Sequence, residues 1–438
     1  MPWLLGLVFA AGYSCLAVLR YRQFDAASWD LGIFTQTVGH YAHFQTPVSD
    51  IKGPGFDILG DHFSPVMALL ALPYRLFPSA ATLLVAQGLL LGLSVVPITR
   101  LAISRLGSPA GVGIGVAYGC SWGLQNAVVV DLHETSFAVP LLAFSLEALL
   151  DRRWRRSVAW ALPLLLVKED LGLTVAMLGI LLMIYGQRRL GALTAILGAA
   201  ATVVTVLVVI PSLNPGHHYP YSGATAALAD PGTKLLTVVL LFAITAFIAL
   251  RSPISLLVLP TLLWRFAGTN PAYWGTGWHY SAVLMPIVFV ALIDGIERLQ
   301  RSTTPLSRRA AGVAVPVVVT LAALLVVRLP LEALVRPETW RATARQHEAE
   351  RALARIPAGT TVESDLGLLS HLVSRDDVFW LGGAPSVLPA YIAIDSGSGW
   401  SPPVPRALPS FAHDLHPGGR YRLIWSSGGF SVLRLQGQ

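Results

Sequence analysis

The stretch SVAWALPLLLVKEDLGLTVAMLGILLMIYG, residues 157–186, points to a membrane fold. It is apolar almost throughout and is interrupted by one charged triplet, Lys168-Glu169-Asp170. An α-helix needs about 20 predominantly apolar residues to cross the roughly 30 Å of hydrocarbon in a bilayer. We therefore predict two neighbouring membrane helices that are separated at the triplet. Charged residues at such a break either close a tight turn as a local ion pair or belong to a functional site.

The composition of the whole chain supports a membrane protein. Of its 438 residues, 54% are hydrophobic and 13% are charged, and the mean hydropathy is +0.61. Soluble domains carry about 25% charged residues, so this chain lacks the polar surface of a soluble enzyme. The same hydrophobicity excludes a disordered chain. The formal net charge is +7, but it contains no long basic run, which argues against nucleic-acid binding.

Apolar stretches recur along residues 1–327 and predict about eleven transmembrane helices. Two of them are too short to span alone, which is tolerated where a broken helix lines a cavity. The predicted spans are residues 3–19, 80–99, 109–127, 136–150, 157–167, 171–186, 191–211, 234–250, 253–267, 281–297 and 310–327.

Arginine is distributed unevenly over the loops between these spans. Cytoplasmic loops of membrane proteins are enriched in Lys and Arg, so the arginine-rich tight turns are predicted to lie inside. Eleven spans then place the N-terminus inside and residues 328–438 outside. The Arg- and Ala-rich composition is typical of a high-GC bacterium, and the predicted location is a bacterial cytoplasmic membrane. The predicted inner cations are Arg100, Arg105, Arg152, Arg153, Arg155, Arg156, Arg188, Arg189, Arg251, Arg298, Arg301, Arg308 and Arg309.

Two segments outside the spans carry structure of their own. The long first outer loop, residues 20–79, contains an apolar segment at 63–77 that two prolines break; we predict an interfacial or re-entrant helix there. The tail, residues 328–438, predicts a small extracytoplasmic α/β domain. It combines a charged amphipathic helix with short buried strands and a closing hairpin. These elements are predicted at residues 332–355, 360–363, 378–381, 391–395 and 421–435.

Two acidic residues, Asp25 and Asp30, follow the first span directly. A partly desolvated carboxylate at a membrane surface is a plausible general base. The alternative for Asp30 is a helix cap at the start of a helix over residues 31–40.

Histidines and acids also gather in the later outer loops. Asp61 and His62 precede the broken apolar helix and either bind a metal, orient a base or start a capped helix. Asp131, His133 and Glu134 lie between the third and fourth spans, where titratable groups are costly unless they are paired or hydrated. Asp61, His62 and His133 are the candidate ligands of a divalent metal.

An aromatic run precedes the tenth span and contains Trp274, Trp278, His279 and Tyr280. Such residues form either an aromatic belt at the membrane interface or a platform for a sugar ring. Arg265 lies nearby and either holds a phosphate or extends its charged end to the interface.

Several short motifs at the predicted outer helix ends join acidic, basic and histidine residues; they lie at residues 24–34, 60–65 (GDHFSP), 131–133 (DLH), 168–170 (KED) and 279–281 (HYS). With these motifs the chain resembles an uncharacterised bacterial family of polytopic membrane proteins, a domain of unknown function. That family resembles in turn the GT-C superfamily, whose members are glycosyltransferases that use lipid-phosphate-linked sugars. The resemblance covers most of the chain.

The resemblance implies a set of roles. The first-loop acid that activates the acceptor would be Asp30 or Asp25, and a second-loop acid would be Asp131 or Glu134. The usual adjacent acidic pair of several GT-C members is absent, because Asp25 and Asp30 are separated. The cation that holds the donor phosphate would be Lys168 or Arg265. The substrate-binding residues would be Glu169, Asp170, Trp274, Trp278, His279 and Tyr280.

The function expected from these roles is inverting transfer of a sugar from a polyprenyl-phosphate donor to an unidentified acceptor at the outer face of the bilayer. The sequence assigns no definite cofactor; the candidate is a divalent metal near Asp61, His62 and His133, which would stabilise the leaving phosphate. The alternatives are a transporter or lipid flippase, since intramembrane charges also suit ion coupling, and a non-catalytic scaffold. A transporter needs access from both sides, whereas the titratable groups here gather at one face.

Overall fold

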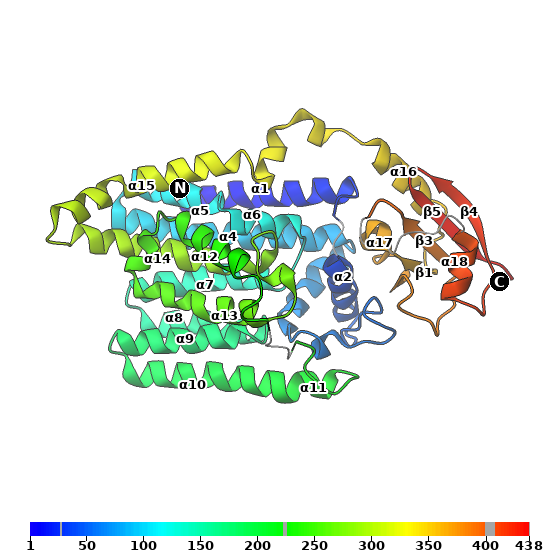
Figure 1. The fold of residues 1–438 in the computed structure, drawn as a ribbon, viewed down its shortest axis with the longest axis horizontal. Coiled ribbons are helices and arrows are strands. Elements are labelled where there is room, and N and C mark those ends of the chain that lie inside the picture. Colours follow the sequence, from blue (N-terminus) through cyan, green and yellow to red (C-terminus); the bar gives the residue numbers. More distant parts are fainter. Residues whose placement is uncertain (27–28, 222–225, 399–407, 438) are drawn as a thin grey trace.

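The computed structural model describes residues 1–26, 29–221, 226–398 and 408–437. The first part of the chain forms a bundle of roughly parallel helices, and a small α/β part covers one end of that bundle (Figure 1). The predicted fold class, a mostly helical chain with several apolar helices and a small C-terminal sheet, is confirmed.

The bundle helices are apolar and differ widely in length. In chain order they are α1 (Pro2–Arg22), α4 (Ala80–Leu106), α5 (Ser108–Gly119), α6 (Trp122–Val129), α7 (Thr135–Leu150), α8 (Trp154–Ala161), α9 (Leu171–Ile184), α10 (Arg188–Val204), α11 (Ile210–Leu213), α12 (Pro231–Ala243), α13 (Leu259–Ala267), α14 (Leu284–Gln300) and α15 (Pro305–Val326).

Among the described residues, four helices are long and apolar enough to cross a membrane: Pro2–Arg22, Ala80–Leu106, Arg188–Leu213 and Pro305–Val326. The total of eleven spans stays a prediction, because other predicted spans are shorter or broken. The span predicted at 109–127 is divided between α5 and α6. Backbone groups freed at such breaks must find partners inside the protein.

Several of the breaks coincide with proline or with unusual backbone geometry. Helix α8 passes at Leu162 into a 3-10 segment, η3 (Leu162–Leu166), whose second residue is a proline. Helix α12 ends at Ala243, and Ala246 and Phe247 follow with positive φ angles of 48° and 60°. Further 3-10 segments, η5 (Ile248–Arg251) and η6 (Pro253–Val258), then lead to α13. Proline removes a helix hydrogen bond, which explains the short segments at prolines.

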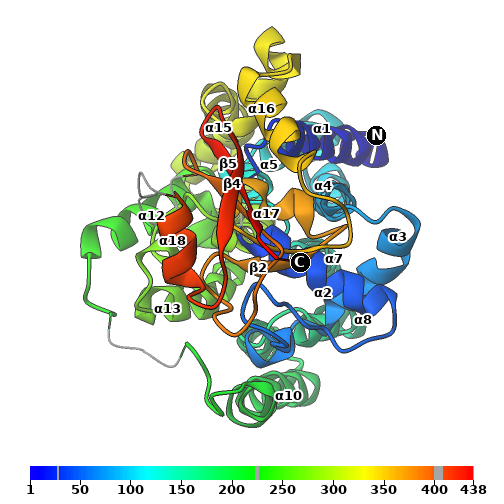
Figure 2. The same cartoon turned by 90° about the vertical axis from the view of Figure 1, so that its right-hand side faces the viewer.

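Helix α10 lies at the edge of the bundle and packs on α9 (Figures 1 and 2). Glycines make this contact close: a Cβ atom on Gly179 would lie 2.5 Å from the carbonyl oxygen of Gly191. Small residues at such positions let membrane helices approach closely. The other side of α10 exposes apolar residues such as Leu193, which is 68% exposed and suits contact with lipid. A π-helical turn, η4 (Thr205–Val209), joins α10 to α11.

The first outer loop forms α2 (Trp29–Ala42), a 3-10 turn η1 (Ile58–Gly60), and an apolar segment made of η2 (Pro65–Leu70) and α3 (Ala71–Leu76). The predicted broken helix at 63–77 is therefore present. Its outer side is strongly apolar, with Leu69, Leu72 and Leu76 all about two-thirds exposed, as an interfacial helix requires.

The C-terminal part contains a five-stranded sheet with the order β2-β1-β3-β5-β4. Strand β1 pairs in parallel with β2 and β3, whereas β5 pairs antiparallel with β3 and β4. The predicted strands and hairpin are confirmed; helices α17 and α18 were not predicted. The elements are α16 (Ala344–Leu353), β1 (Thr361–Ser364), α17 (Leu366–Leu372), β2 (Asp377–Trp380), β3 (Tyr391–Asp395), α18 (Leu408–Leu415), β4 (Tyr421–Ser427) and β5 (Phe430–Leu435).

The helix predicted over residues 332–355 is wrong in its first half. That half consists of two 3-10 segments, η9 (Pro330–Val335) and η10 (Pro337–Trp340). Pro337 prevents a continuous helix. Helix α16 begins only after Thr343, whose hydroxyl accepts a hydrogen bond from the backbone N–H of Gln346 and caps it.

Helix α2 connects the two parts of the molecule. Ile33 of α2 shares a buried apolar cluster with Leu369 of α17, and the side chain of Gln36 donates to the carbonyl of Val378 in β2 at 2.7 Å. Gly32 permits this contact, because a Cβ atom there would lie 1.9 Å from the Cδ2 atom of Leu369. The C-terminal part thus fixes the helix that carries Asp30.

Candidate functional site

Two cavities meet at Asp30. The first, here called the bundle cavity, has a volume of about 270 Å³; the second, the interdomain cavity, has about 710 Å³. Asp30 and Tyr280 line both of them. The bundle cavity is also lined by Phe34, His62, His133, Glu134, Lys168, Glu169, Asp170, Leu173, Thr202, Val206, Tyr219, Tyr221, Trp264, Ala267, Gly268, Tyr273 and His279. The interdomain cavity is also lined by Arg20, Asp25, Trp29, Val129, Val130, Asp131, Asn270, Ala272, Trp278, Leu366 and Trp380.

Asp30 lies in the first turn of α2 and pairs with His133, from the loop before α7. Their Oδ2 and Nε2 atoms are 3.0 Å apart, and the Asp30 side chain is 41% exposed whereas that of His133 is 5% exposed. Burial alone would raise the pKa of Asp30, but His133 outweighs it and holds that pKa below its usual value. Burial would lower the pKa of His133, and the Asp30 carboxylate reverses this and raises it. The pair is therefore an ion pair at neutral pH, with the carboxylate accessible from the cavities.

His279 stacks on His133 with the ring centroids 3.5 Å apart. Burial lowers its pKa well below the usual value, and the neighbouring His133 lowers it further. His279 is therefore neutral beside a protonated imidazole. Neither of its buried ring nitrogens has a hydrogen-bond partner among the described residues. A buried polar group without a partner is costly.

The Lys168-Glu169-Asp170 triplet does not form a local ion pair. The Nζ atom of Lys168 lies 2.8 Å from Glu134, and both side chains are buried. Glu169 instead pairs with Nδ1 of His62 at 2.8 Å and accepts from the hydroxyl of Tyr219 at 3.2 Å. The triplet therefore connects two other loops through long-range pairs, and all of its residues line the bundle cavity. The geometry contradicts the local ion pair, and the functional role of the triplet stays a prediction.

Two carboxyl groups of the site have raised pKa values. Burial raises the pKa of Asp131 to about 7, although Arg20 and His133 act against this. Burial also raises the pKa of Asp170 to about 6, against the lowering effect of Lys168. Neither Oδ atom of Asp131 has a hydrogen-bond partner in the described part of the chain. Strongly perturbed carboxyls beside cavities are typical of functional sites.

The three candidate metal ligands are not gathered into one site. Asp61 pairs with Lys52 at 3.1 Å and accepts from the hydroxyl of Tyr221, whereas His62 and His133 pair with Glu169 and Asp30. The described residues contain no group of three or more His, Cys, Asp or Glu side chains arranged to hold a metal. The donor atoms are occupied by protein partners, so the expected metal set does not fit this geometry.

Arg265 and Trp274 support the site without lining it. Arg265 is completely buried, and its guanidinium donates to the carbonyls of Tyr273 and Gly275, both at 2.8 Å, and to the hydroxyl of Ser281. It thereby holds the loop that carries Tyr280, which corrects the expectation that it binds phosphate. Trp274 is also buried; its indole donates to the carbonyl of Gly268 at 2.9 Å and its ring packs under Lys234.

The remaining predicted residues divide between the two cavities. Asp25 and Trp278 line the interdomain cavity, whereas His279 lines the bundle cavity. The predicted base candidates, Asp25 and Asp30, thus lie on one cavity, but Asp30 alone of the two also reaches the bundle cavity.

Sequence reasoning missed several contributors to the site. Tyr219 and Tyr221 come from the loop after α11, and the ring of Tyr221 stacks on His62 at 4.5 Å. Their tyrosine-rich loop was visible in the sequence, but no local signal directed it to this site. Leu366 and Trp380 come from the C-terminal part, and Trp380 packs against Trp29. Only the docking of that part on α2 brings them to the interdomain cavity.

Solved structures with a similar fold support this view of the architecture. The crystal structure of ArnT from Cupriavidus metallidurans bound to undecaprenyl phosphate is 13% identical, with a TM-score of 0.57 over 97% of this chain and 98% of that one. The apo structure of the same protein is 14% identical, with a TM-score of 0.51 over 95% and 96%. The chain thus has the fold of a polytopic membrane protein similar in architecture to ArnT.

The chain belongs to the family described as "Predicted membrane protein (DUF2079)", whose model matches residues 20–387. The matched region contains every residue that lines the two cavities, from Arg20 to Trp380. No curated protein matches the chain.

Proposed function

We propose that this protein transfers a sugar from a polyprenyl-phosphate donor to an acceptor, with inversion at the anomeric carbon. The observation that carries this proposal is the position of Asp30. Its accessible carboxylate lies where a cavity among the helices meets a cavity under the C-terminal part. A transferase needs a general base between the bound donor and the bound acceptor. Asp30 lies between the two cavities that we assign to these substrates.

The bundle cavity suits the donor. Lys168 offers a buried ammonium group, and its hydrogen bond to Glu134 uses one of three N–H donors. Burial and the neighbouring Lys168 would lower the pKa of His62, but Glu169 outweighs them and raises it. Protonated His62 is therefore a second cation of this cavity. On the side of α9 and η4 the wall is apolar, with Leu173 and Val206. A lipid phosphate fits such a cavity, with its head group at the cations and its chain toward the bilayer.

The interdomain cavity suits the acceptor. Trp29, Trp278 and Trp380 line it and offer aromatic faces for a sugar-like or other amphipathic molecule. The acceptor hydroxyl attacks the anomeric carbon from the face opposite the phosphate. Its proton passes to the Asp30 carboxylate while the bond from the anomeric carbon to the phosphate oxygen breaks. The polyprenyl phosphate leaves as an anion that Lys168 and His62 stabilise.

The proposal includes a location and an orientation. The cavities lie at the bundle end covered by the C-terminal part, and the arginine-rich turns lie at the other end. By the excess of Arg in those turns, we place them in the cytoplasm and the site at the outer face of a bacterial cytoplasmic membrane, with the N-terminus inside. The similarity of the fold to a protein solved with undecaprenyl phosphate supports a lipid-phosphate partner.

The test uses the full chain in nanodiscs with a panel of polyprenyl-phosphate sugars. Release of polyprenyl phosphate is measured for the wild type, for Asp30→Asn, and for the control Asp377→Asn, which removes an exposed carboxylate of β2 outside both cavities. Release that Asp30→Asn abolishes and Asp377→Asn preserves supports the transferase.

Binding of the same donors to Lys168→Ala distinguishes the alternatives. Saturable donor binding that this variant weakens assigns the bundle cavity to the lipid phosphate. Absence of binding to every lipid-linked sugar, with folded variants, would overturn the proposal in favour of a transporter, a flippase or a scaffold.

A further inference from the structure

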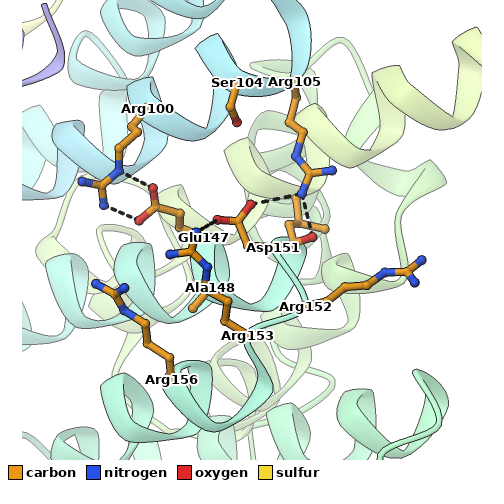
Figure 3. Close-up of a pocket in the computed structure, with 10 residues that line it drawn as sticks. Arg100, Ser104, Arg105, Glu147, Ala148, Asp151, Arg152, Arg153 and Arg156 are labelled. Carbon is orange, nitrogen blue, oxygen red and sulfur yellow. Dashed lines mark hydrogen bonds and ion pairs between the residues drawn. The ribbon is translucent and has the colours of Figure 1, made fainter.

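A third cavity with a distinct charge lies at the opposite end of the bundle. Helix α7 begins beside His133 and Glu134 and ends at Leu150, which places the two ends of its 16 residues about 24 Å apart. At that far end lies a cavity of about 690 Å³, here called the arginine cavity (Figure 3). It is lined by Arg100, Ser104, Arg105, Glu147, Ala148, Leu150, Asp151, Arg152, Arg153 and Arg156.

Part of this positive charge is neutralised by the protein. Arg100 binds Glu147 through two parallel hydrogen bonds of 2.5 and 2.6 Å. Arg105 contacts Asp151 at 3.2 Å and Glu297 of α14 at 3.6 Å, and Arg153 reaches Asp151 at 3.7 Å. These pairs join the ends of α4, α7 and α14, and Figure 3 shows those that Arg100, Arg105 and Arg153 form with Glu147 and Asp151.

The other part of the charge has no protein partner. Arg152 and Arg156 form no ion pair and no side-chain hydrogen bond with the residues that the structure describes. Arg156 extends from α8 toward the Arg100–Glu147 pair (Figure 3). The cavity therefore carries more guanidinium groups than carboxylates, and the surplus is accessible. Planar guanidinium groups recognise phosphate through paired N–H donors.

A neighbouring cavity extends the basic surface to the lipid-facing helices. It has a volume of about 890 Å³, shares Arg153 and Arg156 with the arginine cavity, and adds Arg155, Arg188 and Arg189. Its other wall contains Trp154 and Leu193. Trp154 stacks on Tyr185 at 5.9 Å, an arrangement that suits the membrane interface, and Leu193 faces outward from α10.

We infer that the arginine cavity binds the phosphate of an anionic phospholipid head group at this membrane surface. A phosphate there meets the unpaired Arg156, which points toward the Arg100–Glu147 pair, whereas Arg152 extends away from that pair and adds to the positive charge of the surface (Figure 3). The acyl chains of the lipid follow the apolar surface of α10. Basic pockets beside membrane helices have the chemistry for such head groups. The inference is independent of the proposed transferase, since it concerns the other end of the bundle.

The test compares two charge-matched double variants of the full chain in detergent. R152Q/R156Q removes the unpaired cations, and both residues lack ion pairs with described residues, so folding is preserved. R308Q/R309Q removes two exposed arginines of α15 at the same membrane end, outside both basic cavities. Retention of phosphatidylglycerol and of phosphatidylcholine is measured by native mass spectrometry, and binding of inorganic phosphate by calorimetry.

We expect the wild type and R308Q/R309Q to retain phosphatidylglycerol in preference to phosphatidylcholine, and R152Q/R156Q to bind it about tenfold more weakly, since charge-assisted hydrogen bonds are lost. Binding of inorganic phosphate alone, weakened by R152Q/R156Q, would assign the same site to a free phosphate and overturn the lipid as its source. Equal binding of both lipids by all three proteins, with no phosphate binding, would overturn the site itself.

Discussion

The Nε2 atom of His133 lies 3.0 Å from the Oδ2 atom of Asp30, although 103 positions separate them in the sequence. This contact joins the first outer loop to the loop before α7. It keeps the carboxylate ionised and directs it to the point where the two cavities meet. Several predictions concern this pair and the residues that hold it in place.

Replacing His133 with Gln is expected to move the acidic limb of the pH–activity profile to higher pH. His133 holds the pKa of Asp30 below its usual value, so the base of the wild type stays ionised as the pH falls. Without the imidazolium, burial raises the pKa of Asp30 and the carboxylate is protonated at a higher pH. The measurement is kcat/KM against pH for polyprenyl phosphate release.

The control for this profile is His413→Gln, which changes an exposed histidine of α18 outside the two cavities. Its profile is expected to match that of the wild type. An acidic limb that His133→Gln leaves in place would show that Asp30 does not set the activity at low pH.

The buried Lys168–Glu134 pair is expected to show strong coupling. Removing one partner leaves an uncompensated buried charge, so Lys168→Met is expected to cost roughly 3–5 kcal/mol of stability. The double variant Lys168→Met/Glu134→Gln is expected to recover most of that loss because both charges are removed. Thermal unfolding of the four proteins of this double-mutant cycle in detergent measures the coupling.

Donor binding separates the two partners of this pair. Glu134→Gln frees the ammonium group of Lys168 and is expected to bind the lipid-linked sugar at least as tightly as the wild type. The double variant lacks the cation and is expected to bind it weakly. Equal affinity in these two variants would show that Lys168 does not contact the donor phosphate.

Gly32 is expected to tolerate no side chain without repacking. A Cβ atom there would lie 1.9 Å from the Cδ2 atom of Leu369, so Gly32→Ala is expected to cost about 1–3 kcal/mol by overpacking. The shift would also separate α2 from α17 and lower transferase activity. Adding Leu369→Ala makes room and is expected to restore part of the activity.

Gly312→Ala provides the matched control, since a Cβ atom at Gly312 meets nothing within 4 Å and this glycine lies within α15. Alanine favours helices over glycine, so this change is expected to be neutral or slightly stabilising. Comparable losses in the two alanine variants would contradict the packing argument.

Asp131 is expected to titrate near neutral pH. Burial raises its pKa to about 7, so it is largely protonated at pH 5.5 and largely ionised at pH 8.5. Infrared difference spectra between these two pH values are expected to show a protonated carboxyl signal that Asp131→Asn reduces to the part contributed by Asp170, whose pKa is about 6, and that Asp377→Asn leaves unchanged. A signal of undiminished intensity in Asp131→Asn would assign the whole titration to other groups, such as Asp170.

Much of the architecture could be predicted because it depends on local patterns. Long apolar runs such as that of α4, and the alternation in the hairpin closed at Gly428 and Gly429, are set by the solvent that each side chain must face. The breaks were harder: residues 109–127 read as one apolar run, yet Cys120 and Ser121 separate α5 from α6. The position at which a helix ends inside an apolar run cannot be predicted from its apolar composition alone.

The sequence predicted many of the residues of the candidate site, but not which of them contact one another. The sequence showed that Asp30, His133 and Lys168 carry charge into predicted outer helix ends, where charge is expensive. It did not show that Lys168 pairs with Glu134 rather than with its neighbours in the sequence. It also did not show that the guanidinium of Arg265 donates hydrogen bonds to backbone carbonyls. For the same reason the sequence did not show that Asp61, His62 and His133, the expected metal set, lie apart and each pair with a separate protein partner.

The sequence by itself determined that the chain enters a membrane, that most of the acids and histidines before the C-terminal part gather at one end of the helices, and that an α/β part follows. These properties follow from the hydrophobicity of short segments and from local periodicity. Only the tertiary structure decided which charges meet and where the cavities lie. Pairing in space depends on how α2, the loops after α6 and η3, and the C-terminal part pack together, and residues 103 positions apart carry no local signal of their contact.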